Sequence, residues 1–327
     1  MGEGQGSGAV KGRPRAQSLP AEAVLAVDLP VLSPPLEGMQ RDMDLRGRHP
    51  KPLVNRPAPV RRRFLRVLER LGLLRGAFVG YEAVRALRPY RSPAELDGIP
   101  LPPSRMRVRV SGEADPVWFL ESGRLTAATV EEALGRHGFE LAQLGRLLDF
   151  GCGCGRIVRH WSTLDSVAVH GCDRDPRGVR WCAEKLPFAR FATHGSAPPL
   201  PYPDESFGAV CAVSVFTHLP EEAQREWVDE LRRILVPGGA LLLTTHGDRY
   251  VGRLLPDERA AFDSGDVVVR RPTAVGTTLC TVFHPERYVR ESLARGFELL
   301  EFSPGGAAGT PYQDLVVLRK PAQRPSK

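Results

Sequence analysis

From about residue 117 to the C-terminus, short apolar runs alternate with stretches in which apolar residues recur every three or four positions. The short runs have the length of strands, and the longer stretches have the period of amphipathic helices. The predicted strands are RLLDF (146–150), SVAVHGC (166–172), FARFAT (188–193), GAVCAVSVF (208–216) and GALLLTTH (239–246), and the predicted helices begin near Gly155, 176 and 221. This alternation predicts parallel βαβ units and an α/β, doubly wound sheet.

Beyond residue 247 the alternation lapses and then returns. Residues 284–296 predict a helix that His284 caps and Gly296 terminates, and 297–304 and 313–320 predict two closing strands. The residues between, 247–283, form an insertion with hairpin character. Insertions at the carboxyl edge of such a sheet often cover the active site, so we expect this one to lie over the ligand.

The chain before residue 117 has a different pattern. Residues 1–60 are rich in Pro, Gly and Arg and have neither period, which predicts a disordered basic extension, and residues 321–327 form a short tail. Residues 61–116 are a helical segment and its connector, in which one helical face carries Phe64, Leu65, Val67, Leu68, Leu71 and Leu74. We expect this segment to serve as a lid or as a contact in a possible homodimer, with a membrane surface as the remaining alternative.

The main domain is expected to span 117–320. Its first segment, VWFLESGRL, leads into TAATVEEALGRHG, where Thr126 or Thr129 is expected to cap a helix that Gly138 ends.

The net charge of +7 is uneven, because residues 1–110 carry +10 and the remainder carries −3. A basic N-terminal region is typical of proteins that contact nucleic acid or an acidic surface. However, 40 of the 45 basic residues are Arg, and a GC-rich coding bias accounts for that excess without any partner. We therefore do not expect a nucleic-acid partner.

The six cysteines have no framework spacing, which favours reduced and mostly buried thiols. The sequence has no apolar run of the roughly 18 residues that a membrane span needs, and the apolar N-terminal stretch 23–32 is interrupted by Asp28 and Pro30. These observations predict a cytoplasmic protein without a membrane span.

The stretch DFGCGCG (149–155) follows the first predicted strand. Glycines at alternate positions let the backbone approach a ligand closely at the turn after the first strand of a doubly wound sheet. Cys152 and Cys154 lie between these glycines, where small side chains fit, and a C-x-C pair without a second pair is a poor zinc or redox site. We interpret the stretch as a backbone cradle, and no acidic cluster indicates a metal.

This stretch resembles the first motif, D-x-G-x-G-x-G, of the class I S-adenosylmethionine-dependent methyltransferases. Further features of the family follow in order, namely Asp173 at the end of the second strand, the stretch 193–219, and LRRILVPGGALLLTTH at 231–246. The resemblance covers about 145–320. It implies a Rossmann-like, seven-stranded sheet with an antiparallel last strand, and S-adenosylmethionine as the cofactor.

The resemblance also implies the cofactor-binding residues. They are Asp149, Gly151, Cys152, Gly153 and Gly155 for the methionyl end, Asp173 and Arg174 for the ribose, Ser196 and Ala197 for the adenine, and Ser214 beside the reacting methyl. Asp175 precedes Pro176 and is better assigned to a helix cap. Two positions depart from the family, because Ser196 stands where Asp is frequent and Gly208 follows Phe207 where Asp is common.

Methyl transfer is an in-line displacement in which the protein aligns the acceptor and, for a hydroxyl or activated carbon, supplies a general base. His218 ends the fourth predicted strand and is the first candidate base, with a role in packing the loop as the alternative; His246 is the second. Arg156 either meets a carboxylate or is solvated or salt-bridged. The expected acceptor-side residues are Trp118, Phe119, Glu121 and Tyr312, with core packing as the alternative for the aromatic pair.

The resemblance favours methyl transfer to a small molecule, such as a secondary metabolite or a sugar-like acceptor. Two alternatives remain open from the sequence. One is a nucleic-acid or protein methyltransferase that docks through the basic N-terminus, and the other is an accessory subunit that binds the cofactor without turnover.

Overall fold

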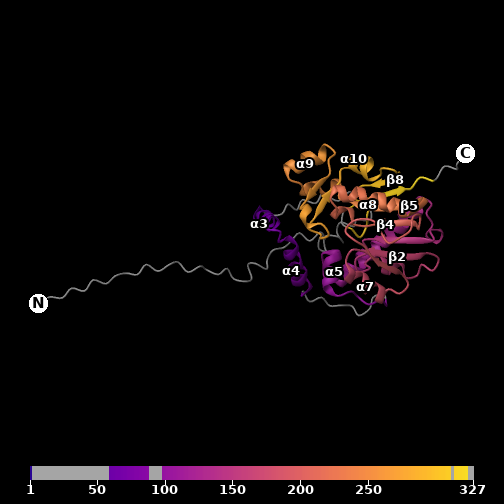
Figure 1. The fold of residues 1–327 in the computed structure, drawn as a ribbon, viewed down its shortest axis with the longest axis horizontal. Helices are drawn as coiled ribbons and strands as arrows, with labels where there is room; N and C mark the ends of the chain where they lie inside the picture. The colour runs from indigo at the N-terminus through magenta and orange to yellow at the C-terminus, as the bar shows by residue number, and fades with distance from the viewer. Residues whose placement is uncertain (2–58, 88–97, 311–312, 323–327) are drawn as a thin grey trace, which may run out of the picture. The chain divides into compact units, whose positions relative to one another are not determined.

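The computed structural model describes residues 1, 59–87, 98–310 and 313–322, and all of these except Met1 belong to one compact unit. At its centre is a seven-stranded sheet with the order β3-β2-β1-β4-β5-β9-β8 (Figure 1). The strands are β1 (Arg146–Phe150), β2 (Ala168–Asp173), β3 (Arg190–Thr193), β4 (Phe207–Ala212), β5 (Leu235–Thr245), β8 (Glu298–Ser303) and β9 (Asp314–Arg319). The first five pair in parallel, and β9 is antiparallel to both β5 and β8. The predicted doubly wound sheet with an antiparallel last strand is confirmed.

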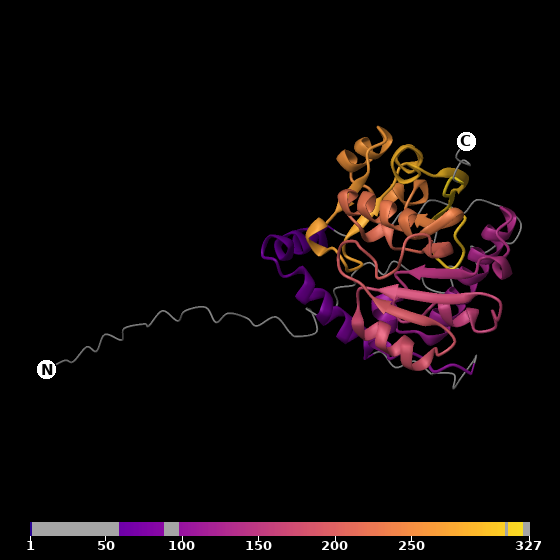
Figure 2. The same cartoon turned by 45° about the vertical axis from the view of Figure 1, so that its right-hand side comes forward.

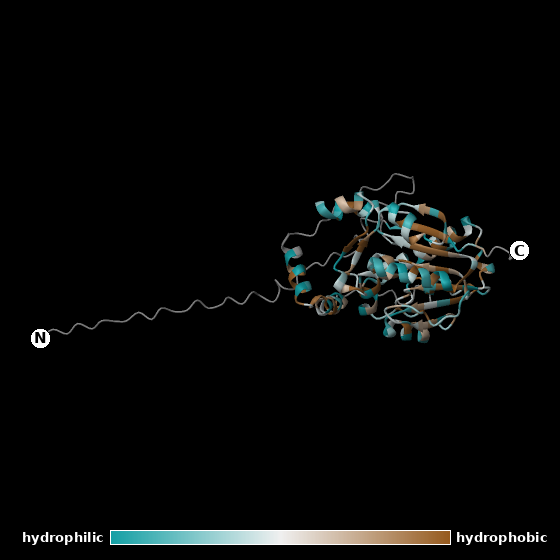
Figure 3. Ribbon diagram, turned by 45° about the horizontal axis from the view of Figure 1, so that its top comes forward, coloured by the Kyte–Doolittle hydropathy of each residue, from teal (hydrophilic) through white to brown (hydrophobic). Residues whose placement is uncertain are grey.

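The strands are apolar along most of their length because both faces of the sheet are covered. Successive residues of a strand point to opposite faces, so Leu147 packs in one core and Leu148 in the other. Helices α6 (Pro116–Arg136) and α7 (Pro176–Lys185) contribute to the first core, and α8 (Glu221–Ile234) contributes to the second. Figure 2 shows helices on both sides of the strands, and the strands are largely hydrophobic in Figure 3.

Two predicted helix boundaries are wrong. After β1 the chain makes turns and then only a short 3₁₀ helix, η2 (Val158–Trp161), instead of a helix that begins near Gly155. Helix α6 begins at Pro116, where the side chain of Asp115 accepts a hydrogen bond from the Val117 amide at 2.9 Å. Thr126 and Thr129 therefore lie inside the helix, and their hydroxyls donate to carbonyls four residues earlier.

The region after β5 contains η4 (Asp248–Arg253), α9 (Pro256–Asp263) and a small antiparallel hairpin. The hairpin consists of β6 (Val268–Arg270) and β7 (Thr281–Phe283), which are joined through η5 (Pro272–Ala274). The predicted helix over 284–296 is a short α10 (Glu286–Tyr288) that continues as a π-helical turn, η6 (Val289–Leu293). His284 does not cap it, because its imidazole is fully buried and bonds to Gln224.

Three helices precede α6 in the described part of the chain: α3 (Pro59–Arg70), α4 (Leu74–Ala86) and α5 (Ser104–Ser111). Helix α4 packs against α5. Two short 3₁₀ turns, η1 (Leu141–Gln143) and η3 (Phe216–His218), complete the elements. In the described ranges no helix is both long and apolar enough to cross a membrane. Tyr312 and nearly all of the extension 1–60 lie outside the described residues.

Candidate cofactor and active site

A cavity of about 510 Å³ lies at the carboxyl ends of the four strands β1 to β4. Residues that directly follow these strands form its floor, in the segments 149–154, 173–176, 194–196 and 213–215. Other walls come from α4, α5, residues 218–227 of η3 and α8, and residues 275–278 of the insertion. As predicted, the insertion reaches over the ligand edge of the sheet.

The glycine-rich loop requires glycine for two physical reasons. Gly151 and Gly153 have φ angles of +84° and +57°, a region that side chains with a Cβ rarely adopt. A Cβ on Gly151 would lie 2.4 Å from Cγ2 of Val215, and one on Gly153 would lie 2.5 Å from Cγ2 of Val110. The loop is therefore a close-packed backbone cradle, although no α-helix begins behind it.

The cysteines in the loop are buried thiols. Cys152 and Cys154 are both free and inaccessible. A hydrogen bond with Cys182, together with burial, raises the pKa of Cys152, and burial raises the pKa of Cys154. These raised pKa values keep both sulfurs protonated at neutral pH, so neither is a reactive thiolate in this structure.

Asp149, the first residue of the motif, has one carboxylate oxygen without a partner. Its Oδ1 accepts a weak hydrogen bond from Sγ of Cys211 at 3.7 Å, whereas Oδ2 is buried and has no hydrogen bond. Burial raises the pKa of Asp149 to about 7, and the positive charge of Arg156 only partly opposes this. A buried carboxylate that lines a cavity in this state is suited to a cationic ligand group.

Arg156 supplies the complementary charge. Its guanidinium is buried, and Nη1 donates long hydrogen bonds of 3.4 and 3.3 Å to the hydroxyls of Ser122 and Thr126 on α6. Burial lowers its pKa, although the side chain still lines the cavity. The solvated alternative for Arg156 is therefore wrong. Asp149 and Arg156 together offer one negative and one positive group, which is the pattern that an amino-acid zwitterion needs.

Asp173 lies at the end of β2, where the cradle reaches it. Its Oδ2 accepts the Gly153 amide at 2.9 Å and its Oδ1 accepts the Asp175 amide at 2.8 Å. Each oxygen keeps a second lone pair for a ligand hydroxyl. Burial raises the pKa of Asp173 and the two amides oppose this rise. Asp175 caps α7 as predicted, with its Oδ1 accepting the Arg177 amide.

The end of β3 forms another part of the cavity. His194 and Ser196 line it, whereas Ala197 is exposed and does not. The His194 ring stacks on Phe150 with centroids 5.3 Å apart and meets Trp227 edge-on at 5.1 Å. The sequence interpretation overlooked His194, although the rule that selected Asp173, a polar residue directly after a parallel strand, also selects it.

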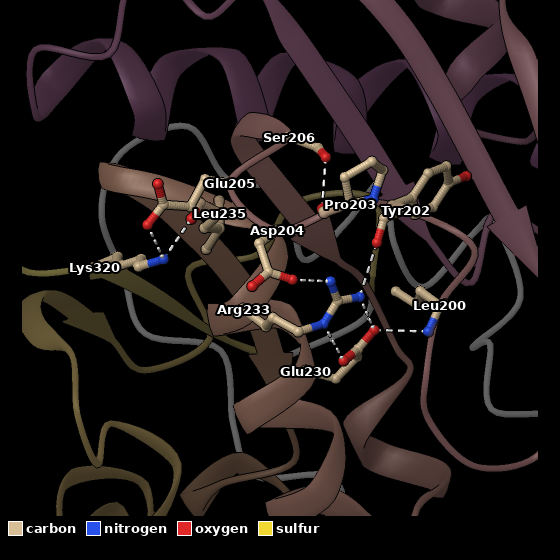
Figure 4. Close-up of polar contacts among 10 residues, drawn as sticks. All are labelled: Leu200, Tyr202, Pro203, Asp204, Glu205, Ser206, Glu230, Arg233, Leu235 and Lys320. Atoms are coloured by element: carbon tan, nitrogen blue, oxygen red, sulfur yellow. Dashed lines mark hydrogen bonds and ion pairs between the residues drawn. The ribbon is translucent and has the colours of Figure 1, made fainter.

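The segment that connects β3 to β4 begins with His194 and Ser196, and hydrogen bonds to α8 hold its later part in place. Figure 4 shows Glu230 of α8 accepting the Leu200 amide, while Arg233 bonds to Glu230, Asp204 and the Tyr202 carbonyl. The Arg233 hydrogen bond lowers the pKa of Glu230, so the pair is ionic. This network fixes the path of the chain that leads away from His194 and Ser196.

His218 lines the cavity beside the end of β4. Its Nδ1 lies 2.7 Å from the Cys280 carbonyl, which only accepts, so Nδ1 carries the proton and Nε2 has a free lone pair. Burial lowers the pKa of His218, which keeps the ring neutral at pH 7. His246 is fully buried behind it, does not line the cavity, and bonds to the Val282 carbonyl.

The remaining predicted site residues are placed as follows. Ser214 and Arg174 line the cavity. Ser214 has a φ of +58°, its amide bonds to Thr244, and its hydroxyl donates to Gln313. Trp118 and Phe119 are buried within α6, and Glu121 forms an exposed ion pair with Arg124; none of these three lines the cavity. Phe78, Val79 and Met106, which the sequence interpretation did not select for the site, line it instead.

Residues 148–243 match the family model described as a methyltransferase domain. The chain is 32% identical over 130 residues to 27-O-demethylrifamycin SV methyltransferase of Amycolatopsis mediterranei, covering 36% of this chain and 46% of that protein. It is also 32% identical over 122 residues to a fatty-acid O-methyltransferase of Mycolicibacterium smegmatis, covering 36% of this chain and 43% of that protein. The chain thus spans less than half the length of these relatives.

Among solved structures, an S-adenosylmethionine dependent methyltransferase from Mesorhizobium loti aligns with a TM-score of 0.45 and 18% identity, over 60% of this chain and 99% of that one. The strand order, the glycine-rich loop and the family match place this domain in the class I S-adenosylmethionine-dependent methyltransferases. The class uses S-adenosylmethionine as its methyl donor. The partnerless oxygen of Asp149 and the buried cation of Arg156 fit the ammonium and carboxylate of its methionyl group.

Proposed function

We propose that this protein transfers a methyl group from S-adenosylmethionine to a small-molecule acceptor, with His218 as the general base. The observation that carries the proposal is that one cavity is lined by Asp149, Arg156, Asp173 and His218, a histidine whose proton lies on Nδ1. Asp149 and Arg156 match the charged methionyl end of the cofactor, Asp173 matches its ribose, and His218 matches the proton of the acceptor.

When bound, the cofactor supplies an electrophilic methyl group on a sulfonium, and the protein contributes alignment and exclusion of water. Asp149 orients the ammonium of the methionyl group and Arg156 orients its carboxylate. Asp173 accepts the ribose hydroxyls through charge-assisted hydrogen bonds while the Gly153 and Asp175 amides hold its carboxylate in position. The strained backbone of Ser214 places the end of β4 against the same space.

His218 is suited to accept a proton from an acceptor hydroxyl, amine or acidic carbon. The Cys280 carbonyl fixes its tautomer, and burial lowers its pKa, which favours the neutral ring with Nε2 unprotonated. His246 lies behind it, with ring centroids 6.4 Å apart, and supports the His218 ring without reaching the cavity.

The acceptor is proposed to be a secondary metabolite with a substantial apolar surface. The walls that do not belong to the cradle carry Phe78, Val79, Met106, Val110 and Leu219. Such a lining favours an apolar metabolite over a sugar, because a sugar needs many hydrogen-bonding partners. The relatives named above, which methylate a rifamycin and fatty acids, are in keeping with that choice.

The first test is calorimetric titration with S-adenosylmethionine and S-adenosylhomocysteine, with NAD as the negative control. Binding of both cofactor forms, followed by transfer of a labelled methyl group to a member of an apolar metabolite panel, would support the proposal. Cofactor binding without transfer to any acceptor would instead favour an accessory subunit, and absence of cofactor binding would overturn the assignment altogether.

A further inference from the structure

Large apolar side chains are exposed mainly on one small part of this protein. Ten are exposed among the described residues, and seven of them lie between residues 64 and 87, on α3, α4 and the turn that joins them. They are Phe64, Val67, Leu71, Leu73, Val79, Val84 and Leu87. Such a concentration marks an interaction surface, whereas scattered exposed apolar residues do not.

Helix α3 has two apolar stripes. Leu65 is buried, whereas Phe64, Val67 and Leu71 are 45%, 51% and 64% exposed. The last three follow one another at spacings of three and four, so they form a single stripe on the outer face of the helix. The sequence pattern combined both stripes into one packing face, and the structure separates them.

Helix α4 buries two charged residues beside Leu74 and Phe78, and most of its exposed residues are small or apolar. Its buried face carries Glu82 and Arg85, which pair with Arg109 at 2.9 Å and Glu113 at 2.5 Å. Apart from Arg75 in its first turn, the exposed residues of α4 and its C-cap are small or apolar, namely Gly76, Val79, Gly80, Ala83, Val84 and Leu87. A surface helix ordinarily turns its charges to water, so this arrangement indicates that the outer face meets a non-aqueous environment.

The charge around the apolar stripes is positive. Residues 59–87 contain seven Arg and two Glu. Arg63, Arg66, Arg70 and Arg75 are exposed, whereas Glu82 is buried and Glu69 accepts a hydrogen bond from Thr273. Apolar residues bordered by arginines are the pattern of helices that lie in the headgroup region of anionic membranes. A second copy of this chain is a poor occupant, because it would bring two sets of arginines together.

We propose that α3 and α4 form the face through which this protein binds the surface of an anionic lipid bilayer. The apolar stripes would enter the headgroup boundary, and the arginines would contact lipid phosphates. Helix α4 also borders the cavity, because Arg75, Phe78 and Val79 line it, and Arg75 donates to the Val275 carbonyl at 3.5 Å. If the proposed function holds, an acceptor dissolved in the bilayer would reach the site past α4.

The test is co-sedimentation of the full chain with phosphatidylcholine vesicles that either contain or lack phosphatidylglycerol. We expect binding only to the anionic vesicles, with loss at high salt. Val67→Glu/Leu71→Glu should reduce the vesicle partition coefficient by at least about tenfold, because two apolar side chains are replaced by charges that the lipid repels. Arg63→Gln/Arg66→Gln should reduce the partition coefficient for the vesicles that contain phosphatidylglycerol and leave that for pure phosphatidylcholine vesicles unchanged.

Phe188→Glu is the matched control, since Phe188 is also exposed but belongs to the α7–β3 connection, and it should leave vesicle binding unchanged. Titration with S-adenosylhomocysteine on the same samples separates failure of this proposal from failure of the proposed function. Equal binding to both vesicle types, no binding to either, or a dimer in the ultracentrifuge that Val67→Glu/Leu71→Glu dissociates would each overturn the membrane assignment. Capture of an acidic protein in place of vesicles would do so as well.

Discussion

Sγ of Cys211, 3.7 Å from Oδ1, is the one hydrogen-bond donor to the Asp149 carboxylate among the described residues. The second oxygen of this buried group, Oδ2, has no hydrogen bond. Asp149 is only 1% exposed, so solvent does little to compensate its charge. The protein therefore holds a destabilised carboxylate at the position where the methionyl ammonium would bind.

Asp149 makes both stability and binding dependent on pH. Its folded pKa of about 7 exceeds the ordinary value, so the folded state binds more protons than the unfolded state between these values and stability falls as pH rises. Asp149→Asn removes this loss. The variant should gain up to about 1.4 kcal/mol per pH unit in unfolding free energy relative to wild type between about pH 5 and about pH 7. Denaturant titrations of both proteins across this range would measure it, and parallel curves would contradict it.

The Asp149 and Arg156 pair should recognise the amino-acid part of the cofactor. Arg156→Gln is expected to weaken S-adenosylhomocysteine binding by about tenfold to about a hundredfold, because a hydrogen-bonded charge pair is lost. Binding of 5′-methylthioadenosine, which lacks the amino and carboxyl groups, should change little. Calorimetry with both ligands tests this, and an equal loss for the two would show that Arg156 acts only through the fold.

Substitution of Asp173 should weaken binding of both S-adenosylhomocysteine and 5′-methylthioadenosine, because both ligands contain the ribose. Asp173→Ala is expected to lower the affinity for each by at least about tenfold. Asp165→Ala, at an exposed aspartate before β2, serves as the control and should bind normally. Retention of wild-type affinity by Asp173→Ala would refute the ribose assignment.

His218 should be needed for turnover and not for cofactor binding. With an acceptor identified, His218→Gln is expected to lower kcat by about a hundredfold or more while S-adenosylhomocysteine affinity stays unchanged. Because burial lowers the pKa of His218, the neutral base persists as pH falls, and the acidic limb of the rate profile should lie below the ordinary histidine pKa. A profile that is identical in the variant would exclude the base role.

Gly151 should tolerate no side chain. Gly151→Ala places a Cβ in a left-handed backbone position and 2.4 Å from Val215, so we expect loss of about 1–2 kcal/mol of stability together with weaker cofactor binding. Gly135→Ala is the matched control. It lies in α6 with nothing within 4 Å of the added carbon, and it should be neutral or stabilising by about 0.5–1 kcal/mol. Thermal melts with and without S-adenosylhomocysteine would separate the two effects.

The doubly wound sheet, the glycine-rich cradle and the position of Asp173 at the end of a strand can all be predicted from the sequence. Strands such as β1 and β4 are buried on both faces, so their composition is apolar and their boundaries are readable; alternate glycines and a terminal aspartate are equally local signals. The sequence-based predictions that were wrong concern helix boundaries, at positions where tertiary contacts compete with local helix propensity. The loop after β1 forms turns, and α6 begins ten residues before Thr126 because Asp115 and Pro116 start it.

The chemistry of the site depends on contacts between segments that are distant in the sequence. The tautomer of His218 depends on the carbonyl of Cys280, 62 residues away, and Arg156 is buried because α6 brings Ser122 and Thr126 against it. The burial of Glu82 and Arg85 on α4 likewise depends on ion pairs with Arg109 of α5 and with Glu113, which no helical period encodes. Charge state, tautomer and exposure depend on which distant segments exclude water from a group, and this property is set by packing and not by the order of neighbouring residues.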